Sequence, residues 1–219
     1  MAQNPFSLPF ERLPDTLPIF PLDNAVVMPG CQLPLNIFEP RYLNMVFDAL
    51  GTDRLIGMVQ PAPSEDGDMP VYRTGTAGRI ISFNETQDGR LLIVLTGICR
   101  FDIRDEIPTS RGYRRVIPDW ARFRCDFGLP SEDADLDRSR LIGLLKEYFQ
   151  RKGIETNWSA VEQMPVPLLA NLLVGQLSFA PQERQALIEA VSVEERLEKL
   201  ISLLRFDVVG TAMGDGTCH

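Results

Sequence analysis

The amino-acid sequence predicts an α+β protein, in which an antiparallel β-barrel lobe with one short helix precedes a bundle of helices. Three observations lead to this prediction. Short apolar runs separated by proline and glycine fill the first two-thirds of the chain. An acidic connector, Pro130–Asp137, follows them, and beyond it apolar residues recur at helical spacing. Many short antiparallel strands with Pro/Gly corners are typical of a small closed or nearly closed barrel.

The first strands are interrupted by prolines. Leu17–Leu22 and Gln32–Ile37 are short apolar runs, and prolines at this frequency place strands at sheet edges or mark bulges and corners. A short helix is predicted over residues 40–51, because a proline suits its first turn and a glycine its end. Leu55–Gln60 is predicted as another strand, and residues 61–70 as an exposed loop. The helix has one apolar face, made of Tyr42, Met45, Val46 and Ala49.

The clearest β signal is a hairpin. Gly78–Thr86 and Arg90–Ile107 flank Asp88-Gly89, a dipeptide that favours a tight turn because both residues can adopt positive φ. Apolar and polar residues alternate in the second half of the second strand, which is the period of a half-buried antiparallel strand. Gly97 interrupts the run where the alternation begins, so a bulge or bend is predicted there. Tyr113–Phe123 is predicted as a further strand.

The C-terminal third carries amphipathic helices. Ser192 and Glu195 have the spacing of a capping box, in which each side chain satisfies a free backbone amide at the start of the last helix. Pro181 suits the first turn of the helix before it. The four apolar stripes predict a small helical bundle. They consist of Leu141, Leu144, Leu145, Tyr148 and Phe149; Leu168, Leu169, Leu172, Leu173 and Leu177; Leu187, Ile188 and Val191; and Val193, Leu197, Leu200, Ile201 and Leu204.

These patterns divide the chain into four parts. Residues 1–14 are predicted to be a flexible N-terminal segment, 15–129 the barrel lobe, 130–206 the helical lobe and 207–219 a disordered tail. The longest apolar stretch, Leu91–Cys99, is about half of the roughly 20 residues that a transmembrane helix needs. The N-terminus also lacks the apolar run of a signal peptide. We therefore expect a cytoplasmic protein without membrane partners.

Charge disfavours nucleic acid as a partner. The net charge is -8, whereas phosphate binding needs a clustered basic surface. One segment, 90–124, is an exception, because its eight arginines outnumber its four acids. We interpret it as the solvated outer faces of strands, with a docking surface for an acidic partner as the alternative.

The common catalytic residues are missing from the sequence. The only histidine, His219, is the last residue, where nothing holds an imidazole in place. No GxxxxGK[ST] loop occurs, and the three lysines, Lys146, Lys152 and Lys199, lie on helix positions expected to face water. The four cysteines are far apart, which disfavours a zinc site or a disulfide scaffold. The sequence therefore predicts a binding protein that is not an enzyme and has no cofactor or metal.

Several motifs are more specific than these patterns. They are Leu17-Pro-Ile-Phe-Pro-Leu22, Val27-Met-Pro-Gly30, Leu33-Pro-Leu-Asn-Ile-Phe-Glu-Pro-Arg-Tyr42, Gly75-Thr-Ala-Gly-Arg-Ile80, Gly97-Ile-Cys-Arg-Phe101 and Ser192-Val-Glu-Glu-Arg-Leu-Glu-Lys-Leu200. In this order the chain resembles the N-terminal domain of the ATP-dependent Lon proteases, from about Asp15 to Phe206. The resemblance implies a PUA-like β-barrel followed by a helical bundle, and a role in recognising polypeptide substrates. It also suggests a stand-alone form of this domain, without an ATPase or protease domain.

The candidate contact residues come from the motifs and from the arginine-rich segment. Two roles are open for each of them, since the side chain either maintains the fold or contacts a partner directly. The residues are Phe38, Glu39, Arg41, Tyr42, Arg114 and Arg115. The leading hypothesis is a polypeptide-binding module, an adaptor or regulator of proteolysis. Its expected partners are unfolded or flexible polypeptides and, in addition, a protease or chaperone. The alternatives are a cryptic peptidase or hydrolase, and an RNA-binding protein that uses the PUA-like barrel.

Overall fold

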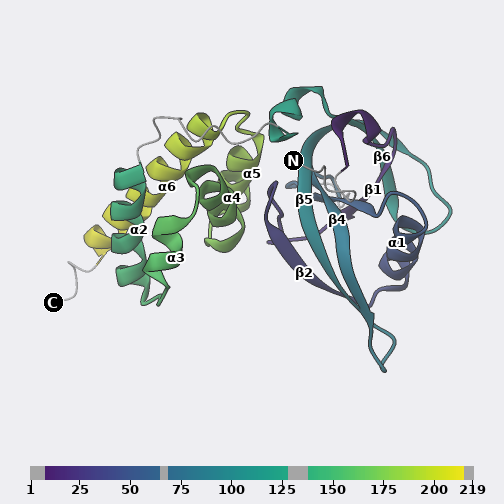
Figure 1. The fold of residues 1–219 in the computed structure, drawn as a ribbon, viewed down its shortest axis with the longest axis horizontal. Helices are drawn as coiled ribbons and strands as arrows, with labels where there is room; N and C mark the ends of the chain where they lie inside the picture. The colour runs from purple at the N-terminus through teal and green to yellow at the C-terminus, as the bar shows by residue number, and fades with distance from the viewer. Residues whose placement is uncertain (1–7, 65–68, 128–137, 215–219) are drawn as a thin grey trace, which may run out of the picture. The chain divides into compact units, whose positions relative to one another are not determined.

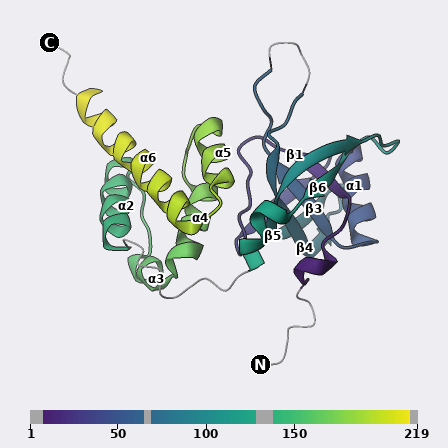
Figure 2. The ribbon, with the colours of Figure 1, turned by 90° about the horizontal axis from the view of Figure 1, so that it is seen from above.

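The computed structural model describes residues 8–64, 69–127 and 138–214. It divides the chain into two compact units, residues 1–129 and 130–219 (Figure 1). The first unit is built on a sheet and the second on helices (Figures 1 and 2). The predicted α+β class is thus confirmed. Within the described parts of the chain, every helix is too short or too polar to cross a bilayer.

Six strands form one sheet in the order β2-β5-β4-β3-β1-β6, and β6 also pairs with β5. The pairings β5–β4–β3–β1–β6–β5 therefore return to their starting strand, and β2 lies outside this circuit. The sequence predicted antiparallel strands throughout this lobe, whereas β1 and β3 pair in parallel, so the sheet is mixed. Helix α1, Pro40–Leu50, joins the region of β2 to β3 and provides the crossover that parallel strands require. The strands are β1 (Leu17–Pro21), β2 (Gln32–Ile37), β3 (Leu55–Val59), β4 (Thr74–Glu85), β5 (Leu91–Ile107) and β6 (Arg114–Asp119).

Strand β5 is long enough to pair with three neighbours. Its first part pairs with β2, its last part with β6, and β4 runs along most of its length. The predicted irregularity at Gly97 is present, since the β4–β5 register shifts where Gly97 and Cys99 face neighbouring β4 residues. A Cβ atom at Gly97 would collide with the backbone of Met28. Gly97 also bonds Gly30 and Cys31 through its backbone, so glycine is required by close backbone approach.

The turn between β4 and β5 differs from the predicted one. Gly89 has φ +79°, but Asp88 is not among the residues with positive φ. The loop holds three residues between Thr86 and Arg90. The Thr86 amide donates to the Arg90 carbonyl at 3.0 Å. The Thr86 hydroxyl accepts from the Arg90 amide at 3.1 Å and also bonds the Asp88 carboxylate. A three-residue loop of this kind needs only one left-handed residue, which Gly89 supplies.

The core of the first unit lies inside the strand circuit and under α1. Leu17, Ile19, Phe101 and Val116 are fully buried there. The predicted apolar face of α1 is buried as expected (Tyr42, Met45, Val46 and Ala49).

Residues 8–14 differ from the flexible segment that was predicted. They carry a turn of 3-10 helix, Phe10–Arg12, and Leu8 and Leu13 pack against the core. The Pro14 carbonyl accepts a hydrogen bond from the Trp120 indole at 3.1 Å. Residues 1–7 lie outside the described residues.

A buried ion pair lies near the last described residues of the first unit. The predicted strand 113–123 stops at Asp119, and a 3-10 segment, Ala121–Phe127, follows. Within it Asp126 meets Arg100 of β5, with Arg100 Nη2 2.7 Å and Nε 3.0 Å from the two carboxylate oxygens. The side chains are 1% and 7% exposed, and the Arg100 backbone amide also donates to Asp126 at 2.9 Å. The Arg100 guanidinium further stacks on Phe123. The pair thus fastens the 3-10 segment to β5.

The second unit is a helical bundle: α2 (Arg138–Lys152), α3 (Trp158–Gln163), α4 (Val166–Gln176), α5 (Pro181–Glu189) and α6 (Val193–Gly214). Helix α3 has no counterpart in the sequence prediction. The capping residues act as predicted, because Ser192 Oγ accepts from the Glu195 amide at 3.1 Å. The Glu195 carboxylate accepts from the Val191 amide at 2.9 Å. Helix α6 continues past Phe206, where it was predicted to end, because buried Val208 extends its apolar stripe. Residues 215–219 lie outside the described residues.

Arg196 connects three helices from inside the bundle. Its side chain is buried, and it donates to the Leu187 and Ala190 carbonyls at 3.2 and 3.0 Å. It also donates to Asn171 Oδ1 of α4 at 2.8 Å. The guanidinium on α6 therefore satisfies the carbonyls at the end of α5, which have no intrahelical partner.

We expect Asp126→Ala to lower the free energy of unfolding of the first unit by about 3–5 kcal/mol, because Arg100 is left as an uncompensated buried charge. Urea unfolding followed by Trp120 fluorescence measures this. Glu11→Ala removes the exposed ion pair with Arg124 and serves as the control, with a small expected effect. Equal effects of the two substitutions would contradict this role of the buried pair.

Arg196→Met is expected to destabilise the helical unit by about 3 kcal/mol, since it leaves buried carbonyls without donors. Arg205→Met replaces an exposed arginine on the same helix and should change little. Circular dichroism at 222 nm during thermal unfolding compares the two variants. A variant at Arg196 as stable as the one at Arg205 would contradict the prediction.

Candidate functional site: the Arg115 pocket and the apolar hairpin surface

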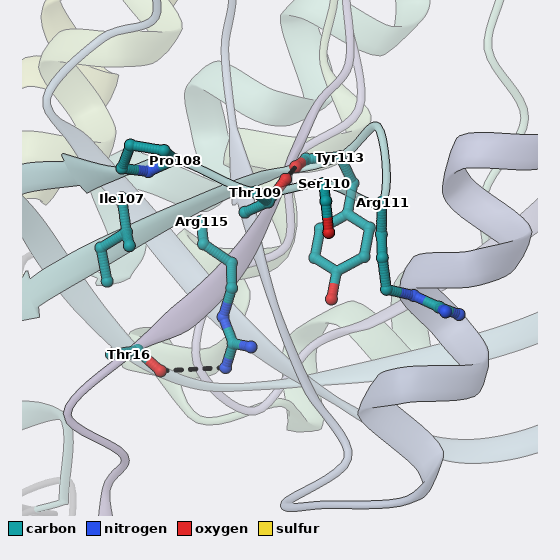
Figure 3. Close-up of a pocket in the computed structure, with 8 residues that line it drawn as sticks. All are labelled: Thr16, Ile107, Pro108, Thr109, Ser110, Arg111, Tyr113 and Arg115. Atoms are coloured by element: carbon teal, nitrogen blue, oxygen red, sulfur yellow. Dashed lines mark hydrogen bonds between the residues drawn. The ribbon is translucent and has the colours of Figure 1, made fainter.

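A polar pocket of about 400 Å³ lies beside the loop that joins β5 to β6 (Figure 3). We call it the Arg115 pocket. It is lined by Thr16, Ile107, Pro108, Thr109, Ser110, Arg111, Tyr113 and Arg115. The loop reverses direction at Gly112, whose φ is +83°. The Thr109 hydroxyl bonds the Tyr113 carbonyl across this turn, which holds the lining residues in place.

Asp48 of α1 organises one wall of the pocket. Its Oδ2 atom accepts from the Tyr113 hydroxyl at 2.8 Å and lies 2.6 Å from Arg111 Nε. Burial and the bond to Asp48 together raise the pKa of Tyr113, because both favour the neutral phenol. The charges of Asp48 and Arg111 compensate each other. This wall therefore presents a neutral phenol and a neutralised guanidinium.

Arg115 stands on the other wall. Its Nη2 donates to Thr16 Oγ1 at 2.9 Å, and its Nε is buried without an acceptor among the described residues. Figure 3 shows the side chains of Arg115, Tyr113 and Arg111 hanging from β6 and its loop toward the same side. Arg115 also lines a neighbouring hollow that contains Asp15 and Asp53. No ion pair joins Arg115 to a carboxylate within the described residues.

The other predicted contact residues lie elsewhere. Arg114 precedes Arg115 on β6, so its side chain is directed to the opposite face. There it forms two bonds to Glu106, at 2.6 and 2.7 Å, and donates to the Met69 carbonyl. The bonds from Arg114 lower the pKa of Glu106. The predicted pair of adjacent arginines therefore does not form one surface.

The residues around the start of α1 serve different roles. Glu39 and Arg41 pair at 2.9 Å, and the Arg41 guanidinium lies over the Tyr42 ring. Tyr42 is 6% exposed and stacks on Phe20, so its ring belongs to the core. Burial raises the pKa of Tyr42. Phe38, in contrast, is 60% exposed and is contacted by Arg90.

Phe38 belongs to a set of exposed apolar side chains on and beside the β4–β5 hairpin, which are divided between its two faces and which we call the apolar hairpin surface: Phe38, Ile81, Phe83 and Leu92. Leu92 faces Asn36 and Asn84 in register, and Phe83 faces Ile93. Leu92 and Phe83 therefore lie on opposite faces of the β4–β5 hairpin, which projects from the unit (Figure 1). Sequence reasoning selected only Phe38, because a β-strand pattern does not show where the hairpin leaves the core.

The helical unit contains a separate apolar hollow of about 440 Å³. Phe149 of α2, Trp158 of α3 and Leu172 of α4 are among the residues that line it. Lys146 lies over the Trp158 ring and pairs with Glu162 at 2.7 Å. The hollow was not predicted, because helix α3 was missed in the sequence.

The arginines of segment 90–124 are largely neutralised. Arg104 and Arg115 form no ion pair among the described residues. The other six each pair with a carboxylate: Arg90–Asp88, Arg100–Asp126, Arg111–Asp48, Arg114–Glu106, Arg122–Asp102 and Arg124–Glu11. The segment therefore does not present the unpaired basic surface that phosphate backbones bind.

Catalytic groups are not assembled in the described residues. Lys146 and Lys152 are exposed, Lys199 is partly exposed, and all three pair with carboxylates, which is not the desolvated setting of a catalytic lysine. Burial raises the pKa of the Cys99 thiol far above its usual range, so it stays protonated. Within the described ranges, no cluster of three histidine, cysteine, aspartate or glutamate residues is placed to hold a metal ion.

The fold and the site define a two-unit α+β protein, with a mixed sheet that closes on itself and a helical bundle. The family model for the ATP-dependent protease La (LON) substrate-binding domain matches residues 16–205. The chain therefore belongs to this family.

Comparison with individual proteins agrees with this family assignment. The chain is 26% identical to Lon protease 2 of Myxococcus xanthus over 205 residues, which cover 89% of the chain and 24% of that protein. It is 28% identical to the Lon protease of Flavobacterium johnsoniae over 200 residues, with 85% and 23% covered. The chain thus spans about a quarter of the length of these relatives.

Two solved structures are similar over most of their length. One is a Lon N-terminal domain protein from Xanthomonas campestris, with a TM-score of 0.60, 25% identity, and 85% of this chain and 97% of that chain covered. The other is the N-terminal domain of the Lon protease of the Mycobacterium avium complex, with a TM-score of 0.61, 20% identity, and 87% and 98% covered.

We expect Asp48→Asn to lower the pKa of Tyr113 toward its ordinary value, because the negative charge beside the phenol is removed. Burial, the larger cause, remains, so the pKa stays above that value. Titration of the tyrosine ring carbons by NMR measures the change. Tyr148, whose pKa is raised mainly by burial, is the control and should not move. An unchanged pKa of Tyr113 would show that the Asp48 charge does not raise it.

Proposed function

We propose that this chain is a non-catalytic module that binds unfolded or flexible polypeptides. Its membership of the LON substrate-binding domain family supports this proposal. The observation that carries it further is the apolar hairpin surface, where large apolar side chains remain in contact with water on a projecting hairpin. Exposed apolar groups of this kind gain free energy when an apolar segment of another chain covers them.

The backbone at this surface offers a second means of binding. Strand β2 pairs with β5 on one side and has no second neighbour in the described sheet. An extended polypeptide adds to such an edge by main-chain hydrogen bonds, with little dependence on its sequence. Pro34 lacks an amide hydrogen in the middle of β2, so a bound strand loses one donor there. This combination suits short contacts with many different chains.

The proposed role is the binding of polypeptides without catalysis. The described lysines are paired with carboxylates and the Cys99 thiol stays protonated, which weighs against a hydrolase. Six of the eight arginines of segment 90–124 are paired with carboxylates, which weighs against RNA binding. Membership of the LON substrate-binding domain family supports a role in holding polypeptides. We therefore propose an adaptor or regulator of proteolysis, with a protease or chaperone as its partner in the cytoplasm.

Phe83→Ser combined with Leu92→Ser is expected to weaken binding of a fluorescein-labelled, reduced and carboxymethylated α-lactalbumin at least about tenfold, because one apolar contact is lost on each face of the hairpin. Fluorescence anisotropy measures the affinity. A folded protein of similar charge should not bind.

Phe47→Ser is the matched control. Phe47 is 51% exposed, as Phe83 nearly is, but it lies on α1 and outside the apolar hairpin surface. Equal losses in the control and the double variant would contradict the assignment of the surface. Absence of binding by the unaltered protein would contradict the proposed function itself.

A further inference from the structure

Arg115 differs from the arginines around it. Its neighbour Arg114 holds Glu106, and Arg111 across the pocket holds Asp48. The Arg115 side chain donates to the neutral hydroxyl of Thr16, and its Nε has no acceptor among the described residues. A guanidinium in such a setting lacks the acceptors that its five N–H groups are able to use.

The pocket around Arg115 has the composition of an anion site. Ser110 and Thr16 contribute hydroxyl groups, and Arg111 lies on the opposite wall. Because Asp48 neutralises Arg111, Arg115 leaves the pocket with about one uncompensated positive charge. Asp15 and Asp53 line the adjoining hollow, but neither forms an ion pair with Arg115.

We propose that the Arg115 pocket binds a carboxylate of a bound polypeptide, either its C-terminal carboxylate or an aspartate or glutamate side chain. This rests on the proposed function, since the carboxylate belongs to the same polypeptide that the module holds. A single uncompensated charge matches a monovalent carboxylate better than a dianionic phosphate. A planar guanidinium also binds the two oxygens of a carboxylate in parallel, which neither lysine nor a hydroxyl does.

The bond to Thr16 defines how the site changes on binding. Arg115 Nε is buried in this conformation, so the guanidinium must turn toward the pocket before Nε reaches a ligand. This rotation exchanges the neutral acceptor Thr16 for a charged one. Hydrogen bonds to charged groups are stronger than those to neutral groups, so a carboxylate favours the exchange.

The test uses the full chain and three labelled decapeptides built on one apolar sequence. One peptide ends in a free carboxylate, one is amidated, and one is amidated but carries an internal glutamate. Fluorescence anisotropy should show at least one carboxylate peptide binding about tenfold more tightly than the amidated apolar peptide. Arg115→Lys, which keeps the charge but not the planar fork, should remove most of this difference. Arg104→Lys is the matched control, because Arg104 is exposed and outside the pocket.

A second measurement separates this inference from the proposed function. Acetate and inorganic phosphate are titrated into protein with ¹⁵N-labelled arginine, and the Arg115 Nε–H signal is followed. A saturable shift with acetate at Arg115 and not at Arg104 supports the pocket. Equal shifts at both arginines, or tighter binding of phosphate, would overturn the carboxylate assignment. If all peptides bind equally well to the wild-type protein, the inference fails and the proposed function stands; if no peptide binds, the proposed function fails.

Discussion

The backbone of β5 is the constraint on which the first unit depends. One strand of 17 residues forms ladders with β2, β4 and β6, so the sheet closes only if this strand curves. Gly97 allows the curve, because the loop around Met28 crosses the strand where a side chain would stand. The bulges in the β4–β5 and β5–β6 ladders distribute the rest of the bend. The Arg115 pocket and the apolar hairpin surface lie toward opposite ends of this strand's ladders.

Two buried arginines have a comparable role in the two units. Arg100 fastens the 3-10 segment to β5 through Asp126, and Arg196 ties α4, α5 and α6 through backbone carbonyls and Asn171. Each arginine is buried only because nearly all its donors find acceptors, since an unpaired buried charge is costly. The hydrogen bonds and the ion pair of these arginines are directional. They select one arrangement of neighbouring elements, whereas apolar contacts alone allow several.

Charge pairing also determines which groups the surface offers to a partner. Most arginines of segment 90–124 are paired with carboxylates from distant parts of the sequence, such as Arg111 with Asp48 and Arg124 with Glu11. The apparent basic segment is therefore close to neutral in space. Among the described residues of this unit, the apolar hairpin surface and the unpaired guanidinium of Arg115 in its pocket remain available to a partner. An apolar surface toward one end of β5 and a cation toward the other are suited to extended chains that are partly hydrophobic and carry a carboxylate.

The sequence by itself determined the α+β class, the strands, the short helix and the capped final helix, because these depend on local periodicity, turn residues and caps. The motifs from Leu17 to Leu200 also determined the family. Tertiary structure alone decided that β1 and β3 pair in parallel and that Phe38 is exposed. It also decided that Arg114 pairs with Glu106 of the neighbouring strand. These features depend on contacts between residues far apart in the chain, which local patterns do not encode; Arg115 was predicted, but its missing carboxylate partner became visible only in three dimensions.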